Sequence, residues 1–160
     1  MKTHVYDTHL RWTAGDGEGT KSYRAYSRNH SIGAAGRPEI GAAGRPEIAA
    51  SSDPSFRGDS SRYNPEELLV ASLSSCHMLW YLHLCSANGI TVVEYCDNAS
   101  GSMEENGGAG QFVSVELHPV VTLAPGCQRE KALDLHHEAH AMCFIARSVN
   151  FPVTVVPVFA

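Results

Sequence analysis

Two cysteines stand in segments that the sequence predicts to be helical, and they are the first candidates for chemistry. Cys76 lies near the middle of a long apolar stretch, and Cys143 lies in the last third of a second predicted helix. A cysteine thiol is a weak nucleophile until it is deprotonated, and burial alone raises its pKa, so a reactive cysteine needs a fixed cation beside the sulfur. Without one, a helical cysteine packs as a small hydrophobic residue. Thiol chemistry in this chain therefore requires an arginine that the fold brings close to the sulfur.

A second set of residues has the spacing of metal ligands. His136, His140 and Cys143 follow one another at intervals of four and three, which places them on one face of the second predicted helix and is a spacing that can bind zinc. Cys76 or His83 would complete a set of four ligands. A zinc-binding protein is therefore the alternative to thiol chemistry, and a non-catalytic binding protein with inert thiols is the third hypothesis.

The overall composition is that of one folded domain, which we place at residues 1–160. The chain has 160 residues, of which 43% are hydrophobic and 18% are charged, enough for a core and too few charges for a disordered chain. Lys and Arg total 12 against 17 Asp and Glu, and no basic run exceeds two residues. Because a protein that binds the phosphate backbone normally carries a basic stripe, we do not expect nucleic acid to be a partner.

The N-terminal segment and the cysteines predict a cytoplasmic protein. The first fifteen residues are polar and contain no apolar block of the kind found in a secretory signal. Five cysteines, an odd number, are a poor basis for a disulfide framework. We interpret the remaining three, Cys85, Cys96 and Cys127, as structural or incidental.

The longest uncharged segment, residues 68–93, has 26 residues and is long enough to cross a membrane. It also contains serine, histidine and asparagine side chains, which are costly in lipid, and no second apolar span pairs with it. We therefore expect no membrane partner and interpret the segment as a buried central helix. Asn64 and Pro65, followed by two glutamates, predict the start of this helix, and Asn88 with Gly89 predicts its end.

The remaining segments predict an α+β fold. A second helix is expected over 128–149, and a Gly-rich hairpin loop over 101–110. Residues 33–40 repeat as 41–48 with the same sequence, GAAGRPEI, which we interpret as a tandem duplication in a hairpin or loop. Segments with strand-like patterns are 3–12, 20–31, 91–95, 112–123 and 152–159. With a third strand counted before the long helix in addition to these segments, the expected order is three strands, a long helix, two strands, a helix and a strand.

The long helix also carries a sequence signature. Residues 64–69 (NPEELL), followed by 71–77 (ASLSSCH), resemble the helix signature of the OsmC/Ohr family, the osmotically inducible and organic hydroperoxide resistance proteins, with a carboxylate ten residues before a cysteine. Cys143 corresponds to the second cysteine of that family, and the order of elements matches over nearly the whole chain. The resemblance implies an OsmC-like fold, which is an α+β intertwined homodimer with a long buried central helix.

The resemblance also implies an activity, that of a thiol-dependent peroxidase that reduces organic hydroperoxides to alcohols. Cys76 would become a sulfenic acid and then form a disulfide with Cys143. In the family, an arginine from the N-terminal strands activates the thiol and is held by the carboxylate that opens the long helix. These residues match Arg28, with Arg24 as the alternative, and Glu66. No bound cofactor is implied, and an external dithiol, of the lipoyl type in the family, would reduce the disulfide.

Helix geometry keeps Glu66 and Cys76 apart within one chain. Ten residues along a continuous helix separate them by roughly 15 Å along the axis and by about 80° around it. If both belong to one active site, Glu66 must come from a second copy of the chain. The sequence therefore predicts an obligate homodimer with two equivalent intersubunit sites.

Apolar residues near the two thiols are candidates for a substrate pocket that favours bulky hydroperoxides over hydrogen peroxide. They are Leu69, Leu73, Trp80, Phe144 and Ile145. Phe144 also marks a departure from the family pattern, which often has proline directly after the second cysteine. His77, directly after Cys76, points about 100° away from it around the helix and need not touch the thiol.

Overall fold

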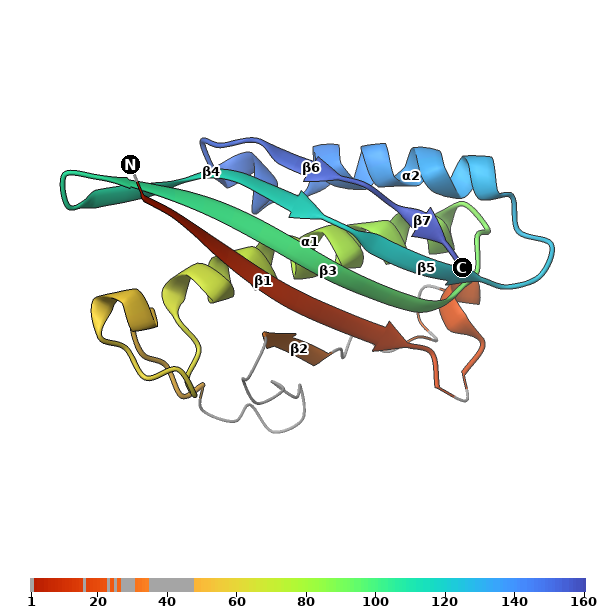
Figure 1. Cartoon of the computed structure of the whole chain (residues 1–160). Coiled ribbons are helices and arrows are strands. Elements are labelled where there is room, and N and C mark those ends of the chain that lie inside the picture. The colour runs from red at the N-terminus through yellow and green to blue at the C-terminus, as the bar shows by residue number, and fades with distance from the viewer. Residues whose placement is uncertain (1, 16, 23, 25, 27–30, 35–47) are drawn as a thin grey trace.

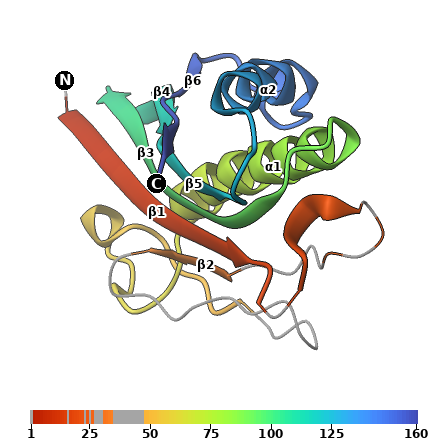
Figure 2. The same cartoon turned by 90° about the vertical axis from the view of Figure 1, so that its right-hand side faces the viewer.

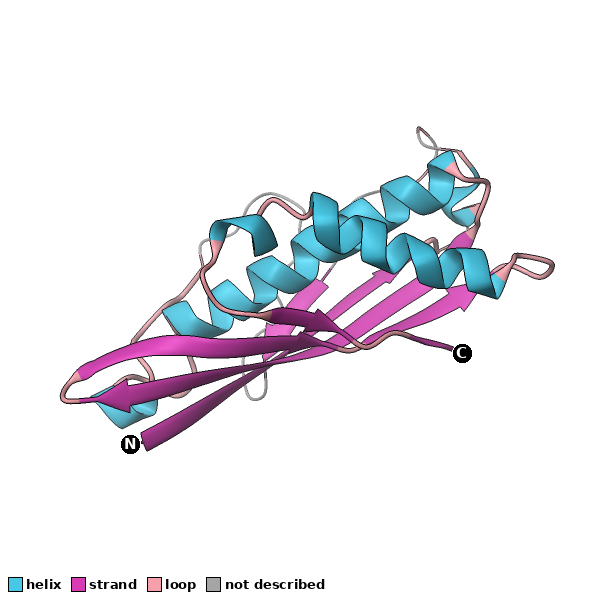
Figure 3. Ribbon diagram, turned by 90° about the horizontal axis from the view of Figure 1, so that it is seen from above, coloured by secondary structure: helices cyan, strands magenta, loops and turns pink. Residues whose placement is uncertain are grey.

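The structure, a computed structural model, describes residues 2–15, 17–22, 24, 26, 31–34 and 48–160. Both α-helices lie on one face of a seven-stranded sheet (Figures 1 and 3). In chain order the elements are β1 (Lys2–Thr13), β2 (Ser31–Ala34), α1 (Pro65–Ala87), β3 (Val92–Asn106), β4 (Ala109–Leu117), β5 (Pro119–Leu123), α2 (Arg129–Met142), β6 (Val153–Val155) and β7 (Val158–Phe159). This α+β architecture confirms the predicted fold class.

The longest strand, β3, forms the centre of the sheet. β1 pairs with it antiparallel along its whole length, from Lys2 opposite Glu105 to Thr13 opposite Glu94. On the other edge of β3, β5 pairs with the first part and β4 with the second part, both antiparallel. β6 and β7 extend β4 and β5 in parallel orientation, and β2 pairs with the outer edge of β1.

Side chains of β1 alternate between the core and solvent. Tyr6, Leu10 and Trp12 are buried, whereas the odd-numbered residues between them, Asp7, His9 and Arg11, are exposed. Because successive side chains of a strand point to opposite faces, this alternation means that β1 has one covered face, the face on which the helices pack. The predicted strand over 3–12 is confirmed.

The helix α1 begins and ends where the sequence predicted. The Oδ1 atom of Asn64 accepts a hydrogen bond from the Glu67 N–H at 2.7 Å, and Oε2 of Glu67 accepts one from the Asn64 N–H at 3.0 Å, which is a reciprocal capping box. Gly89, with φ +73°, follows the helix end in a conformation that strains other residues. Between these ends α1 packs against β1, β3 and α2 (Figure 2). The buried hydrophobic residues form two core clusters, one that contains Trp12 and one that contains Tyr6, and α1 contributes side chains to both.

A buried polar contact ties the middle of α1 to the sheet. Ser74 Oγ donates a 2.5 Å hydrogen bond to Oδ2 of Asp97 on β3, and the His118 N–H donates one to Oδ1 at 2.6 Å. Burial raises the pKa of Asp97. His118, whose N–H is bonded to Asp97, separates the end of β4 from the start of β5, and both strands pair with β3 in the same register.

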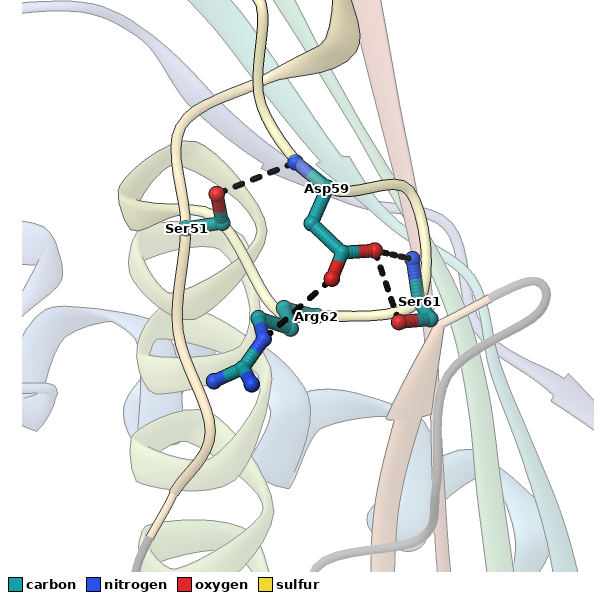
Figure 4. Close-up of polar contacts among 4 residues, drawn as sticks. All are labelled: Ser51, Asp59, Ser61 and Arg62. Atoms are coloured by element: carbon teal, nitrogen blue, oxygen red, sulfur yellow. Dashed lines mark hydrogen bonds and ion pairs between the residues drawn. The ribbon is translucent and has the colours of Figure 1, made fainter.

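Local polar contacts of Asp59 close the segment that leads into α1 (Figure 4). The carboxylate accepts hydrogen bonds from the Ser61 hydroxyl at 2.7 Å, the Ser61 N–H at 2.9 Å and Arg62 Nε at 3.3 Å. The Asp59 N–H donates to Ser51 Oγ at 3.0 Å. The hydrogen bonds from Ser61 lower the pKa of Asp59.

The predicted strand over 20–31 is wrong at the described residues 20–22, 24 and 26, whereas its last residue, Ser31, begins β2. Gly19–Lys21 forms a short 3₁₀ turn, because the Thr20 hydroxyl donates to the Ile90 carbonyl and accepts from the Val92 N–H, both at 2.8 Å. These bonds draw the segment toward the start of β3. In the part of the chain that the structure describes, two strands precede α1 instead of three, and residues 35–47 of the duplication lie outside that part.

Other element boundaries also differ from the prediction. Most of 101–110 continues β3 and β4, because the turn needs only Gly107 and Gly108, both with positive φ. The predicted strand over 112–123 breaks at His118, as described above. The predicted strand over 152–159 breaks near Pro157, which has no N–H to pair.

The second helix is shorter than predicted and ends at Met142. Cys143 follows it with extended backbone, φ −66° and ψ 112°, and a separate 3₁₀ turn occupies Ala146–Ser148. Cys143 therefore caps the helix instead of lying within it. This change of direction turns the residues after Cys143 back toward α1, where Phe144 meets Trp80.

Among the described residues, α1 is the one helix that is long and apolar enough to span a membrane by length and composition. Half of its most apolar 18-residue stretch is buried inside the protein. Core helices of soluble proteins have the same length and composition, so this feature is weak evidence for a membrane span.

Candidate active site

An apolar cavity of about 640 Å³ lies along one face of α1, with Cys76 in its wall. Residues three, four and seven positions from Cys76 lie on the same helix face, which is why α1 supplies most of the lining. The α1 residues are Leu68, Ala71, Ser72, Ser75, Cys76, Leu79, Trp80 and His83. Ile32 and Ile48 from the N-terminal part, and Phe144 and Ile145 from the segment after α2, complete the wall.

Aromatic rings form the wall of the cavity next to Cys76. Trp80, one turn further along α1, meets Phe144 edge to face, with ring centroids 5.4 Å apart and planes at 88°. Trp80 also meets His83 edge to face at 5.7 Å. Phe144 is 66% exposed, so its ring forms part of the outer rim. Such a wall suits an apolar ligand with a small polar group.

The structure brings the two predicted cysteines together. The Cys76 thiol lies beside the Cys143 thiol and interacts with it. Cys143 is buried, and its sulfur accepts a hydrogen bond from the Ala146 N–H at 3.5 Å. Burial, together with the neighbouring Cys76, raises the pKa of the Cys143 thiol to about 11, so this thiol is protonated near neutral pH. Cys76 is half-buried and lines the cavity, which places the earlier sulfur against the ligand space.

Two buried histidines form a direct contact between the helices close to the thiols. His77 Nε2 and His136 Nδ1 are 3.0 Å apart and share a hydrogen bond, and the rings are nearly parallel, at 8°. His136 also stacks on Tyr81, with centroids 3.7 Å apart. Burial, with a smaller effect of His140, lowers the pKa of His77 to about 3, and burial, with His77 next, lowers that of His136 to about 2. Both rings are therefore neutral at physiological pH.

Glu66 lies in the first turn of α1, away from Cys76, as helix geometry predicted. It is half-buried and is not one of the cavity-lining residues that the structure describes. Burial, followed by the charge of Glu66, raises the pKa of Tyr6, which places the carboxylate near that ring. Its Oε2 atom is buried without a hydrogen-bond partner among the described residues.

The predicted arginines are not part of the described cavity wall. Arg28 lies outside the described residues. Arg24 is described and exposed, and it does not line the cavity. The described part of the wall contains neither arginine nor lysine. The cation that a reactive Cys76 needs must therefore come from residues beyond this described wall.

The predicted pocket residues divide between the cavity and the core. Trp80, Phe144 and Ile145 line the cavity. Leu69 is half-buried elsewhere on α1, and Leu73 is fully buried against the sheet, in the core cluster that contains Tyr6. Four of the missed lining residues of α1 could have been found from the sequence, because Leu68, Ser72, Leu79 and His83 lie three, four, seven or eight positions from Cys76.

The described part of the chain contains no set of side chains arranged to bind zinc, which was the alternative hypothesis. His136 is hydrogen-bonded to His77, and Cys143 contacts Cys76, so the face that carries them is packed against α1. No group of three or more His, Cys, Asp or Glu side chains among the described residues could hold a metal ion. The i, i+4, i+7 spacing serves helix packing here.

The other three cysteines lie apart from the cavity wall and are free thiols. Cys85 is buried beside Tyr81, and burial raises its pKa to about 12. The Cys127 sulfur accepts a hydrogen bond from the Thr91 N–H at 3.4 Å. Cys96 lies beside Glu94 at the surface of the sheet.

Comparison with known proteins agrees with this architecture. The sequence profile of OsmC-like proteins matches residues 58–157, a range that includes both helices and both thiols of the site. No curated protein matches the chain.

Several solved structures share the fold. An OsmC-like protein of unknown function from Vibrio cholerae is 29% identical, with a TM-score of 0.66 and 99% of each chain covered. An organic hydroperoxide resistance protein from Legionella pneumophila is 16% identical, with a TM-score of 0.58 over 100% of this chain and 97% of that one. An organic hydroperoxide resistance protein from Elizabethkingia anophelis, with thiocyanate bound, is 22% identical, with a TM-score of 0.57 over 83% of this chain and 89% of that one.

Proposed function

We propose that this chain, which belongs to the OsmC-like protein family, is a thiol-dependent peroxidase that reduces organic hydroperoxides to alcohols. The observation that supports this most directly is the contact between the Cys76 and Cys143 thiols at the wall of an apolar cavity. Some structural relatives are named organic hydroperoxide resistance proteins, which agrees with the proposal.

In the proposed cycle, the Cys76 thiolate attacks the O–O bond of the hydroperoxide. That bond breaks, the alkoxide takes up a proton and leaves as an alcohol, and Cys76 becomes a sulfenic acid. Cys143 then attacks the sulfenic sulfur: an S–S bond forms, the S–O bond breaks, and the hydroxide leaves with the Cys143 proton as water. An external dithiol, of the lipoyl type, reduces the disulfide, so no bound cofactor is needed.

The shape and polarity of the cavity support an organic substrate. Trp80, Phe144 and Ile145 offer apolar surface to the organic group of a hydroperoxide, whereas hydrogen peroxide has no apolar surface to bury there. We therefore expect bulky organic hydroperoxides to react faster than hydrogen peroxide.

The proposal also requires a cation beside Cys76 and a partner for Glu66. We assign the cation to Arg28, with Arg24 as the alternative, and we propose that Glu66 of a second copy holds it. Two observations support this arrangement: α1 is continuous from Glu66 to Cys76, and the Glu66 Oε2 atom is buried without a described partner. The active form would then be a homodimer with intersubunit sites, and we place it in the reducing cytoplasm, where five cysteines stay thiols.

Steady-state kinetics test the activity. Wild-type protein should oxidise dihydrolipoamide in the presence of cumene hydroperoxide, and more slowly with hydrogen peroxide. Cys76→Ser should abolish turnover, whereas Cys96→Ser, a half-buried cysteine outside the described cavity wall, should keep it. A wild-type protein that leaves cumene hydroperoxide unchanged would favour a non-catalytic binding protein instead. Emission spectrometry for zinc on the purified protein checks the metal alternative.

Mixed dimers test the intersubunit site. Neither Cys76→Ser nor Glu66→Gln protein should be active alone. Co-expressed with different tags, a dimer of one copy of each contains one site with both an intact Cys76 and an intact Glu66, so it should recover up to half of the wild-type activity. Inactive mixed dimers, or an active monomer by light scattering, would contradict the arrangement.

A further inference from the structure

We propose that the hydrogen bond between His77 and His136 fixes the position of α2 along α1 and thereby places Cys143 for disulfide formation with Cys76. The inference rests on the proposed function, because it concerns the second step of that cycle. Neither histidine belongs to the described cavity wall, so both are positioning residues that act through the thiols.

The geometry of the pair constrains the helices in two directions. His77 is 0% exposed and His136 is 2% exposed, and their facing nitrogens are 3.0 Å apart. The His136 ring is at the same time stacked on Tyr81 at 3.7 Å. A hydrogen bond depends on both distance and angle, so sliding or rotating α2 by a fraction of a turn would break it.

The rest of the buried face of α2 has little else to resist sliding. Besides His136, its buried residues are Ala132, Leu135 and Ala139. Two of these three are alanines, whose methyl groups interdigitate little with a neighbouring helix, so Leu135 is the one large apolar side chain among them. The histidine contact therefore supplies the specificity that the apolar side chains lack.

The pair is also costly, which argues against a role in stability alone. The outer nitrogens, Nδ1 of His77 and Nε2 of His136, are buried without hydrogen-bond partners among the described residues. Two apolar side chains could fill the same space without unpaired polar atoms. A costly buried polar pair is best explained by a requirement for one particular alignment.

The pair lies close to both sulfurs along the chain. His77 directly follows Cys76, and Cys143 comes seven residues after His136, which is two helical turns or roughly 10.5 Å. Disulfide formation needs Cβ atoms roughly 3.5–4.5 Å apart. A misplacement of about 1 Å can slow a reaction by about a hundredfold, so the position of α2 affects closure strongly. The attack of Cys76 on peroxide needs no residue of the buried α2 face and should not depend on it.

A single-turnover experiment separates the two steps. The full-length protein is mixed with one equivalent of tert-butyl hydroperoxide. Trapping with dimedone reports sulfenic acid at Cys76, and alkylation followed by intact mass spectrometry reports the disulfide. His136→Phe keeps an aromatic ring on Tyr81 and removes the hydrogen bond. His136→Asn is the matched conservative variant, because its amide places a polar atom near the position of Nδ1.

We expect His136→Phe to leave the rate of Cys76 oxidation within about twofold of wild type and to slow disulfide closure at least about tenfold. His136→Asn should restore closure to within about threefold. Closure at the wild-type rate in His136→Phe, or no rescue in His136→Asn, would overturn the proposal, since a merely structural role predicts no such rescue. Circular dichroism checks folding, and His77→Leu, which removes the bond from the other helix, replaces any variant that does not fold.

A second readout does not depend on peroxide. In a glutathione redox buffer, the effective concentration of the two thiols should fall about tenfold in His136→Phe. The double variant, His136→Phe with His77→Leu, should have an effective concentration no lower than that of the more affected single variant, because each substitution removes the same hydrogen bond. A loss in the double variant equal to the product of the two single losses would overturn the proposal. If wild-type protein does not react with the hydroperoxide but His136→Phe lowers the effective concentration as expected, the proposed peroxidase function is wrong and the positioning role is supported.

Discussion

The ring of Phe144 stands edge to face against that of Trp80, with centroids 5.4 Å apart. Phe144 directly follows one thiol residue, Cys143, and Trp80 lies one turn after the other, Cys76, so the two chain segments that carry the sulfurs meet a second time at the rim of the cavity. Because Phe144 is 66% exposed, its ring contributes to the ligand site far more than to the core. Substitutions at this rim therefore test substrate binding without unfolding the protein.

Phe144→Ala should weaken the preference for bulky substrates. An aromatic contact contributes about 0.5–1.5 kcal/mol, so kcat/KM for cumene hydroperoxide should fall by roughly 2–12-fold. The value for hydrogen peroxide, which has no apolar group to bury, should stay unchanged. Met142→Ala is a suitable control, since Met142 is exposed at the end of α2 and is not a described lining residue. An equal loss for both peroxides would contradict the assigned role of the ring.

Cys143→Ser should permit one oxidation event and then stall. Without the second thiol, the Cys76 sulfenic acid has no partner for condensation, so it should accumulate as a species that dimedone traps in the mass spectrum. Cys127→Ser, a half-buried cysteine bonded to Thr91, serves as the control and should turn over normally. Continued turnover of Cys143→Ser with a dithiol would show that Cys143 is not needed to resolve the sulfenic acid.

The buried histidines should make the protein less stable in mild acid. Their folded pKa values, about 3 for His77 and about 2 for His136, lie below the usual 6.5. Well above pH 6.5 both histidines are neutral in the folded and in the unfolded protein. As the pH falls below 6.5, the unfolded chain takes up protons that the folded protein excludes, so the free energy of unfolding decreases. By pH 5 the loss is about 2 kcal/mol for each histidine.

Urea unfolding between pH 7.5 and 5.5, at constant protein concentration, checks this pH dependence above the range in which carboxyl groups with ordinary pKa values titrate. His136→Phe removes one of the two groups and should reduce the pH dependence by roughly half. A stability that rises as the pH falls through this window would contradict the buried neutral pair.

Ser74→Ala should destabilise the protein by about 1–3 kcal/mol, because it leaves one oxygen of the buried Asp97 carboxyl without its 2.5 Å hydrogen bond. The pKa of Asp97, already raised by burial, should rise further. Ser72→Ala is the matched control on the same helix, since Ser72 is half-buried and lines the cavity. Equal effects of both substitutions in urea unfolding would mean that the Asp97 contact contributes nothing specific.

Much of the local structure followed from the sequence. The caps of α1 were predicted because Asn64, Pro65 and Gly89 act within a few residues of their own positions. The strand β1 was predicted because its alternating pattern reports one covered face. The two cysteines were identified because the helical patterns and the resemblance that single them out are properties of the neighbouring sequence and do not depend on how the helices pack.

The tertiary structure alone decided which residues meet. The hydrogen bond from the His118 N–H to Asp97 joins residues 21 positions apart, and the placement of Leu73 in the core depends on which face of α1 the sheet covers. His77 and His136 are 59 residues apart, and each in isolation resembles an ordinary helical histidine. Such contacts arise from how two helices pack, a property of both surfaces together, and no periodicity within either segment contains it.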